Sequence, residues 1–139
     1  LRGVFLCLKH EIRHMLKVGG GAIVNTASVA GVIADPGMAP YIASKHGVIG
    51  LTRAAAIDYG RYGIRVNALA PGFFPSKMTK GLLTQAGGAD VIAKHAPLQR
   101  IGDDEDLKGA ALLFASDAGK HITGQTLAVD GGVSIIAGG

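Results

Sequence analysis

The 139-residue sequence contains no tryptophan and a single cysteine, and aromatic residues make up only 5% of it. Because Cys7 has no possible partner within the chain, an internal disulfide is excluded and a reducing, cytoplasmic location is expected. No run of about 20 apolar residues occurs, so no membrane-spanning helix and no membrane partner are predicted. Charged residues interrupt positions 1–17 too often for a secretory signal, and none is expected.

Apolar residues make up 48% of the chain and charged residues 17%, a composition too hydrophobic for a disordered protein. The 22 glycines fall irregularly, which excludes a collagen repeat. The net charge of +4 arises mainly in residues 1–17, where no stacking platform of aromatic residues accompanies it. We interpret this charge as a solvated helix face and predict no nucleic-acid partner.

Helical and strand patterns alternate along the chain. Apolar residues recur at helical spacing in positions 1–17, and Cys7 among them is expected to be a small core residue. The predicted elements are, in order, a helix over 1–17, a strand over 22–26, a loop over 29–40, a helix over 41–59, a strand over 64–70, an irregular stretch over 73–101 with one or two short helices, a helix from Asp103 or Asp104 to about 116, and a strand over 126–129. Strands that alternate with helices pair in parallel, so an α/β fold with a doubly wound parallel sheet is predicted.

Three chemically active side chains are predicted to meet at one edge of this sheet. Ligands of open parallel sheets bind outside the carboxyl ends of the strands. Ser28 follows the first predicted strand, and the helix that starts at the same edge carries Tyr41 and Lys45. Since residues four apart share a helix face, we expect Ser28, Tyr41 and Lys45 to line one cleft.

The chemistry of these three residues is suited to proton transfer. A phenol does not act as a base at neutral pH by itself, but an ammonium group within about 4–6 Å favours its phenolate form. Such a tyrosine can take a proton from an alcohol or return one to a carbonyl, while a serine hydroxyl stabilises charge on the same oxygen. Taken singly, each residue also has a plainer interpretation, as a turn former, a packing residue and a solvated charge.

Four segments give the sequence a family resemblance. Tyr41-Ile42-Ala43-Ser44-Lys45 has the form YxxSK, and the serine segment 25–31 precedes it. Asn67-Ala68-Leu69-Ala70-Pro71-Gly72 follows, and then Ile122-Thr123-Gly124-Gln125 with Val129-Asp130-Gly131-Gly132. With these segments in this order, the sequence resembles the C-terminal half of a short-chain dehydrogenase/reductase of the simple dehydrogenase branch. The resemblance implies a single Rossmann-like domain, of which residues 1–139 would be that half, and an NAD- or NADP-dependent enzyme.

The resemblance assigns a role to each residue of the candidate site. It implies that Ser28 polarises the substrate oxygen, Tyr41 is the general acid/base, and Lys45 favours the phenolate and hydrogen-bonds the nicotinamide ribose. The implied cofactor contacts are Thr26, Ala27, Tyr41, Lys45, Pro71, Gly72, Phe74 and Ser76. The substrate would be a small alcohol or ketone, since family members interconvert secondary alcohols and ketones. Steroid, sugar, acyl-thioester, cyclic diol and small-alcohol enzymes of the family share these motifs, so the motifs do not select a substrate. NAD-dependent and NADP-dependent members share them as well, so they do not select the cofactor.

Part of the family pattern is missing from these 139 residues. Gly19, Gly20 and Gly21 precede a strand, so they cannot be the glycine-rich turn that binds the pyrophosphate. An alternative is therefore a non-catalytic fragment, or an interface half that cannot bind cofactor alone. The resemblance implies a homotetramer or homodimer for the complete protein, with the helices 1–17 and 41–59 in one interface and the strand 126–129 in another. A further option is epimerisation or dehydration with tightly held NAD, although the PG and VDGG segments favour the simple dehydrogenases.

Two further groups of residues have open interpretations. Phe73, Phe74, Met78, Leu82 and Leu83 fall in the family's substrate-lid region and are either the apolar side of a lid or a local core. His10 and His14 have a chelating spacing, but no carboxylate–histidine set accompanies them, so no metal site is predicted.

The first predicted strand would also be left with an unpaired apolar edge in this chain alone, which is an aggregation hazard.

Overall fold

The structure, a computed structural model, describes residues 1–74 and 89–136. Its helices are α1 (Arg2–Val18), α2 (Ala39–Tyr59), α4 (Ala89–His95) and α5 (Asp104–Ala115). Its strands are β1 (Gly21–Thr26), β2 (Ile64–Pro71) and β3 (Thr126–Val129), and the short 3₁₀ turns are η1 (Val29–Gly31), η2 (Gly60–Tyr62), η3 (Asp117–Gly119) and η4 (Val133–Ile135). The predicted alternation of helices and strands is confirmed.

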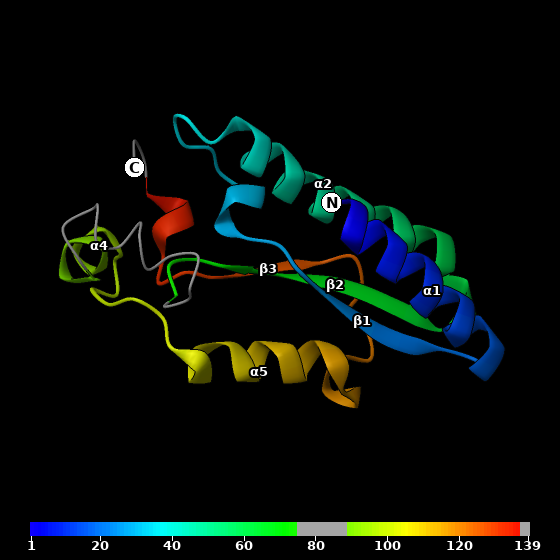
Figure 1. The fold of residues 1–139 in the computed structure, drawn as a ribbon. Helices are drawn as coiled ribbons and strands as arrows, with labels where there is room; N and C mark the ends of the chain where they lie inside the picture. The colour runs from blue at the N-terminus through cyan, green and yellow to red at the C-terminus, as the bar shows by residue number, and fades with distance from the viewer. Residues whose placement is uncertain (75–88, 137–139) are drawn as a thin grey trace.

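The three strands form one parallel sheet in the order β1-β2-β3. Thr26 pairs with Leu69, and Pro71 pairs with Val129, so the carboxyl ends of all three strands lie at one end of the sheet. Helices α1 and α2 cover one face of the sheet and α5 covers the other (Figure 1). This arrangement confirms the predicted α/β architecture with helices on both faces of a parallel sheet.

The apolar core beneath α1 and α2 fixes α2 along the sheet. One buried cluster joins the two helices to β1 and β2 through Leu8, Ile12, Ile23, Ala56, Ile64 and Val66. A second cluster lies nearer the carboxyl ends of the strands, where Val48 and Ile49 of α2 pack against Ala27 and Ala68. Because Val48 and Ile49 are one turn beyond Lys45, their burial fixes the first turns of α2 beside the end of β1.

Helix α1 has one buried side and one exposed apolar side. Leu8 and Ile12 are buried against the sheet, and Gly19 ends the helix in a left-handed conformation with φ of 88°. The expectation that Cys7 is a core residue is wrong, because its side chain is exposed. Successive helical residues point about 100° apart, so burial of Leu8 turns Cys7 toward solvent. Phe5 of the same helix is also exposed, at 53%.

The loop before β3 is held by polar groups of β2. Asn67 is fully buried, and its amide donates to the carbonyl of Ile122 at 3.0 Å while its carbonyl accepts from the amide of Gln125 at 3.0 Å. Thr123 accepts from the backbone amide of Val66 at 3.0 Å. The buried side chain of Asn67 thus orders residues 122–125.

Within the described ranges, β1 pairs with a single neighbour, β2, so its other edge has no strand beside it. Ile23 of β1 is buried, whereas Val24 is half-buried. A helix long and apolar enough to cross a membrane does not occur among residues 1–74 and 89–136.

Candidate active site

Ser28 occupies a tight turn directly after β1. Ala27 continues the strand pairing by donating its amide to Leu69 at 2.7 Å, and Ser28 then begins η1. The hydroxyl oxygen of Ser28 accepts from the amide of Ala30 at 3.2 Å. This bond uses an oxygen lone pair, so the hydroxyl hydrogen of Ser28 can still be donated to another group. Thr26, at the end of the strand, is exposed.

The turn that carries Ser28 packs directly on α2. A Cβ at Gly31 would lie 2.9 Å from the carbonyl oxygen of Lys45, so only glycine allows this approach. Strand β1, which leads into this turn, is also tied to α2, because the amide of Asn25 donates to the hydroxyl of Thr52 at 3.0 Å. The structure therefore brings the Ser28 turn against the second turn of α2, where Lys45 lies.

Tyr41 and Lys45 lie together at the start of α2. The Lys45 ammonium nitrogen is 5.6 Å from the centroid of the Tyr41 ring. Tyr41 is 37% exposed and Lys45 is half-buried, so a ligand can reach the phenol. An ammonium at this distance from an aromatic ring interacts favourably with it and places a positive charge beside the phenol group. The predicted pairing of these two side chains on one helix face is present in the structure.

Pro71 and Gly72 lie at the carboxyl end of the neighbouring strand. Gly72 donates its amide to the carbonyl of Val129 at 3.0 Å, and a Cβ at Gly72 would lie 2.9 Å from the Cα of Asp130. The close approach of the two strand ends thus requires glycine at position 72. Ser76, the remaining predicted cofactor contact, lies outside the described residues, as do Met78, Leu82 and Leu83.

The VDGG segment ends β3 in a compact turn. The carboxylate of Asp130 accepts from the amide of Gly132 at 3.0 Å and from that of Ser134 at 2.8 Å. Burial raises the pKa of Asp130, but hydrogen bonds from the Ser134 hydroxyl and from these amides outweigh it, and the pKa lies below its ordinary value. A charged Asp130 therefore orders the backbone at the start of η4.

A cavity of about 450 Å³ opens beside these strand ends. Its walls come from the ends of β2 and β3, from the chain after α4 and from the first turn of α5; they include Phe73, Phe74, Pro97, Arg100, Asp106 and Val129. Ser28, Tyr41 and Lys45 are not among its lining residues, so in the described part of the chain the cavity adjoins the Pro71–Gly72 side rather than the tyrosine. Phe73 and Phe74 face it, which agrees with either interpretation made from the sequence.

Three polar groups of the fold were not identified from the sequence. Arg65 holds the end of α5, Asn67 holds the loop before β3, and Arg100 pairs with Asp106. For Arg65 and Asn67, the available signal was a charged or amide residue inside an apolar strand pattern.

No group of three or more potential metal ligands occurs among the described residues.

Comparison with known proteins identifies the family. The family model described as enoyl-(acyl carrier protein) reductase matches residues 1–134. The chain is 45% identical over 138 residues to an A-factor type gamma-butyrolactone 1'-reductase of Streptomyces virginiae, covering 98% of this chain and 54% of that protein. It is 44% identical over 133 residues to a 3-oxoacyl-[acyl-carrier-protein] reductase of Staphylococcus epidermidis, covering 96% and 54%.

A solved structure shows the same fold. A gluconate 5-dehydrogenase from Burkholderia cenocepacia, in complex with NADP and tartrate, superposes with a TM-score of 0.94 at 41% identity, covering 99% of this chain and 54% of that one. The chain thus spans about half the length of the relatives it matches. With residues 1–134 matched by the family model and the Rossmann-like sheet in place, the chain belongs to the short-chain dehydrogenase/reductase family.

Proposed function

We propose that the protein is an NAD- or NADP-dependent oxidoreductase that interconverts a secondary alcohol and a ketone, with Ser28, Tyr41 and Lys45 as its catalytic residues. The observation that carries this proposal is the Lys45 ammonium 5.6 Å from the Tyr41 ring, at the helix start against which the Ser28 turn packs. A cytoplasmic location belongs to the same proposal, supported by the exposed free thiol of Cys7, which is typical of a reducing compartment.

In the oxidation direction, the Tyr41 phenolate oxygen takes the proton of the substrate hydroxyl. The Lys45 ammonium lies beside Tyr41, 5.6 Å from its ring centroid, where it can donate to a ribose hydroxyl of the cofactor. The Ser28 hydroxyl donates a hydrogen bond to the same substrate oxygen and stabilises the charge that develops on it. In the reverse direction, Tyr41 returns the proton to the carbonyl oxygen. When bound, the nicotinamide accepts or supplies the hydride at the substrate carbon.

The residues at the carboxyl edge fit a dinucleotide. Thr26 is exposed and Pro71, Gly72 and Phe74 are half-buried, so backbone groups of two neighbouring strand ends are within reach of a ligand. Lys45 adds a cation that can donate to ribose hydroxyls. We propose that Thr26, Ala27, Pro71, Gly72, Phe74 and Ser76 contact the nicotinamide half of the cofactor, together with Tyr41 and Lys45.

The proposal is tested by assaying the complete protein with NAD and NADP against secondary alcohols and ketones. Hydroxy acids and 3-oxoacyl thioesters are suitable substrates, because the similar proteins include a gluconate 5-dehydrogenase and a 3-oxoacyl-[acyl-carrier-protein] reductase. We expect hydride transfer to one nicotinamide with at least one of these classes, followed as the appearance or loss of reduced cofactor. A protein that binds neither dinucleotide contradicts the proposal.

A second candidate concerns the 139 residues taken by themselves. Gly19 and Gly20 lie between α1 and β1, and Gly21 is the first residue of β1, so this glycine run precedes a strand rather than following one. In the described ranges the outer edge of β1 has no neighbour. We propose that these residues alone do not hold a dinucleotide and instead supply the nicotinamide side and the subunit contacts. Calorimetric titration of residues 1–139 with NADP, compared with the complete protein, distinguishes this candidate.

The subunit contact that we propose lies on α1 and α2. A groove of about 440 Å³ between these helices is lined mostly by apolar residues, including Phe5, Leu8, Ile12, Leu16 and Tyr59. Phe5 is 53% exposed and Leu16 is 42% exposed beside it. Exposed apolar surface of this kind on a helix pair is typical of an interface between copies, and we propose a homodimer or homotetramer.

Replacing Phe5 with arginine is expected to dissociate this interface, because the change places a charge where apolar surface would be buried. Sedimentation velocity of the complete protein should then show a smaller assembly than the wild type. Leu112→Arg is the matched control, since Leu112 is 66% exposed on α5, on the other face of the sheet. Equal assembly of the wild type and Phe5→Arg would contradict the α1–α2 interface.

A further inference from the structure

Gly102 lies beside Phe73, two residues beyond the end of β2. The amide of Gly102 donates to the carbonyl of Phe73 at 2.9 Å. A Cβ built at Gly102 would overlap the ring of Phe74, so the ring lies directly on the glycine. Gly102 therefore fixes both the backbone at Phe73 and the side chain of Phe74.

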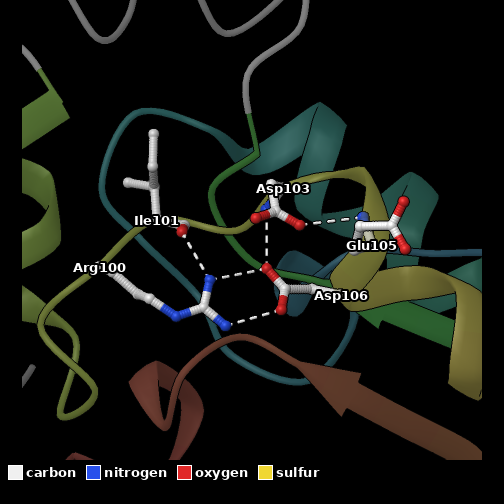
Figure 2. A network of polar contacts seen from close by, with 5 residues as sticks. All are labelled: Arg100, Ile101, Asp103, Glu105 and Asp106. Carbon is white, nitrogen blue, oxygen red and sulfur yellow. Dashed lines mark hydrogen bonds and ion pairs between the residues drawn. The ribbon is translucent and has the colours of Figure 1, made fainter.

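Ile101, the residue before Gly102, belongs to a polar network at the start of α5 (Figure 2). Both oxygens of Asp106 accept from the Arg100 guanidinium, at 2.7 and 2.6 Å, and Arg100 also donates to the carbonyl of Ile101 at 3.2 Å. The same Asp106 carboxylate accepts from the amide of Asp103 at 2.8 Å, which completes the capping box of α5. The peptide that precedes Gly102 is thus tied to a helix packed on the sheet.

The opposite charges of Arg100 and Asp106 stabilise this network. The hydrogen bond and charge of Arg100, together with the Asp103 amide, hold the pKa of Asp106 well below its ordinary value, so the carboxylate is charged at neutral pH. A bidentate guanidinium–carboxylate pair fixes direction as well as distance. The neighbouring Lys108–Glu105 pair on the same helix end is exposed, and among the described residues neither of its side chains hydrogen-bonds Ile101 or Gly102.

We propose that Gly102, Arg100 and Asp106 are positioning residues for the nicotinamide end of the cofactor site. The Arg100–Asp106 pair fixes the peptide at 101–102, Gly102 fixes Phe73 and Phe74, and the Phe74 backbone contacts the bound nicotinamide. This inference rests on the proposed function, which supplies the role of Phe74. It adds three residues, none of which belongs to the proposed catalytic set or to the cofactor contacts.

Gly102→Ala is the first test, in the complete protein. The added methyl group must displace the Phe74 ring, so we expect the Kd and the KM for the dinucleotide to rise about tenfold, with kcat changed less than about twofold. A contact made equally in the ground state and the transition state gives this pattern when it is lost. Gly109→Ala on α5 is the control, since a Cβ there meets nothing within 4 Å.

Asp106→Asn is the second test, and it can be measured even if the Gly102→Ala variant fails to fold. Asparagine can still accept from the Asp103 amide, so the helix cap is kept while the ion pair is lost. We expect a rise of about threefold to tenfold in the dinucleotide Kd, measured by titration of reduced-cofactor fluorescence. Glu105→Gln removes a carboxylate from the same helix turn and should leave the Kd unchanged.

The outcomes separate this inference from the proposed function. If the wild type binds and turns over the dinucleotide but both variants match their controls in Kd, the positioning role is overturned and the proposed function stands. A fall in melting temperature without a change in Kd has the same meaning. If the wild type binds no dinucleotide, both are overturned.

Discussion

Tyr41→Phe is expected to lower kcat about a thousandfold in the complete protein, because the change removes only the oxygen that carries the proton. The ring remains beside the Lys45 ammonium, 5.6 Å from its centroid, so the packing at the start of α2 is retained. We therefore expect the dinucleotide Kd to change by less than about twofold. Steady-state kinetics and a binding titration on the same preparation measure both quantities.

Tyr62→Phe provides the matched control for this result. Tyr62 lies in η2, just before the amino end of β2, and its ring contacts Tyr59 and Arg61. The candidate site lies at the carboxyl end of the same strand, so the control removes a phenol oxygen at the other end of the sheet. Near-normal turnover by Tyr41→Phe would remove Tyr41 from the proposed mechanism, whatever the control shows.

Arg65→Met is expected to lower the free energy of unfolding by about 3 kcal/mol, because it removes charge-assisted hydrogen bonds from a partly buried site. The guanidinium donates to the carbonyls of Phe114 and Gly119 at 2.8 Å and to that of Ser116 at 3.0 Å. These carbonyls belong to the end of α5 and the turn after it, where backbone acceptors have no partner within the helix. Methionine fills similar space but offers no donor. Urea denaturation followed by circular dichroism measures the loss.

Arg61→Met is the control for this variant, since Arg61 lies on the surface over the ring of Tyr62. We expect it to cost less than about 1 kcal/mol, as exposed cation–ring contacts contribute little. Arg65→Lys should fall between the two, because one ammonium cannot reach acceptors spread around a planar guanidinium. Equal stability of the Arg65→Met and Arg61→Met proteins would show that the carbonyls at the end of α5 find other donors.

Strand positions were predictable because the three runs are apolar on both faces, as parallel strands between two helical layers must be. The start of α2 was placed two residues too late. Pro40 indicated a loop, yet it lies in the first turn of the helix, where a missing amide costs no hydrogen bond. Asp103 was correctly named as one of two possible caps of α5, since its side chain accepts from the amide of Glu105 at 2.9 Å.

The pairing of Tyr41 with Lys45 was also predictable, because helical spacing alone brings residues four apart together. Contacts between distant segments were not. The Phe73–Gly102 bond and the Arg65 contacts with α5 depend on where whole elements lie, which no local pattern encodes. Cys7 was misplaced for a related reason: helical periodicity identifies an apolar helix, whereas the sheet selects which of its sides is buried.

The register of the parallel sheet also determines the order in which the chain can fold. Gly21 pairs with Ile64 and Ala68 with Thr126, so each pair of strands closes a loop of roughly 40 to 60 residues. Such non-local pairing makes folding slow, since the entropy of loop closure is lost before the ladder forms. During synthesis β1 emerges before α2 and β2, so its pairing with β2 waits until roughly 40 further residues have been added. Helix α1, which needs only local contacts, is the element that can shield this strand in the interval.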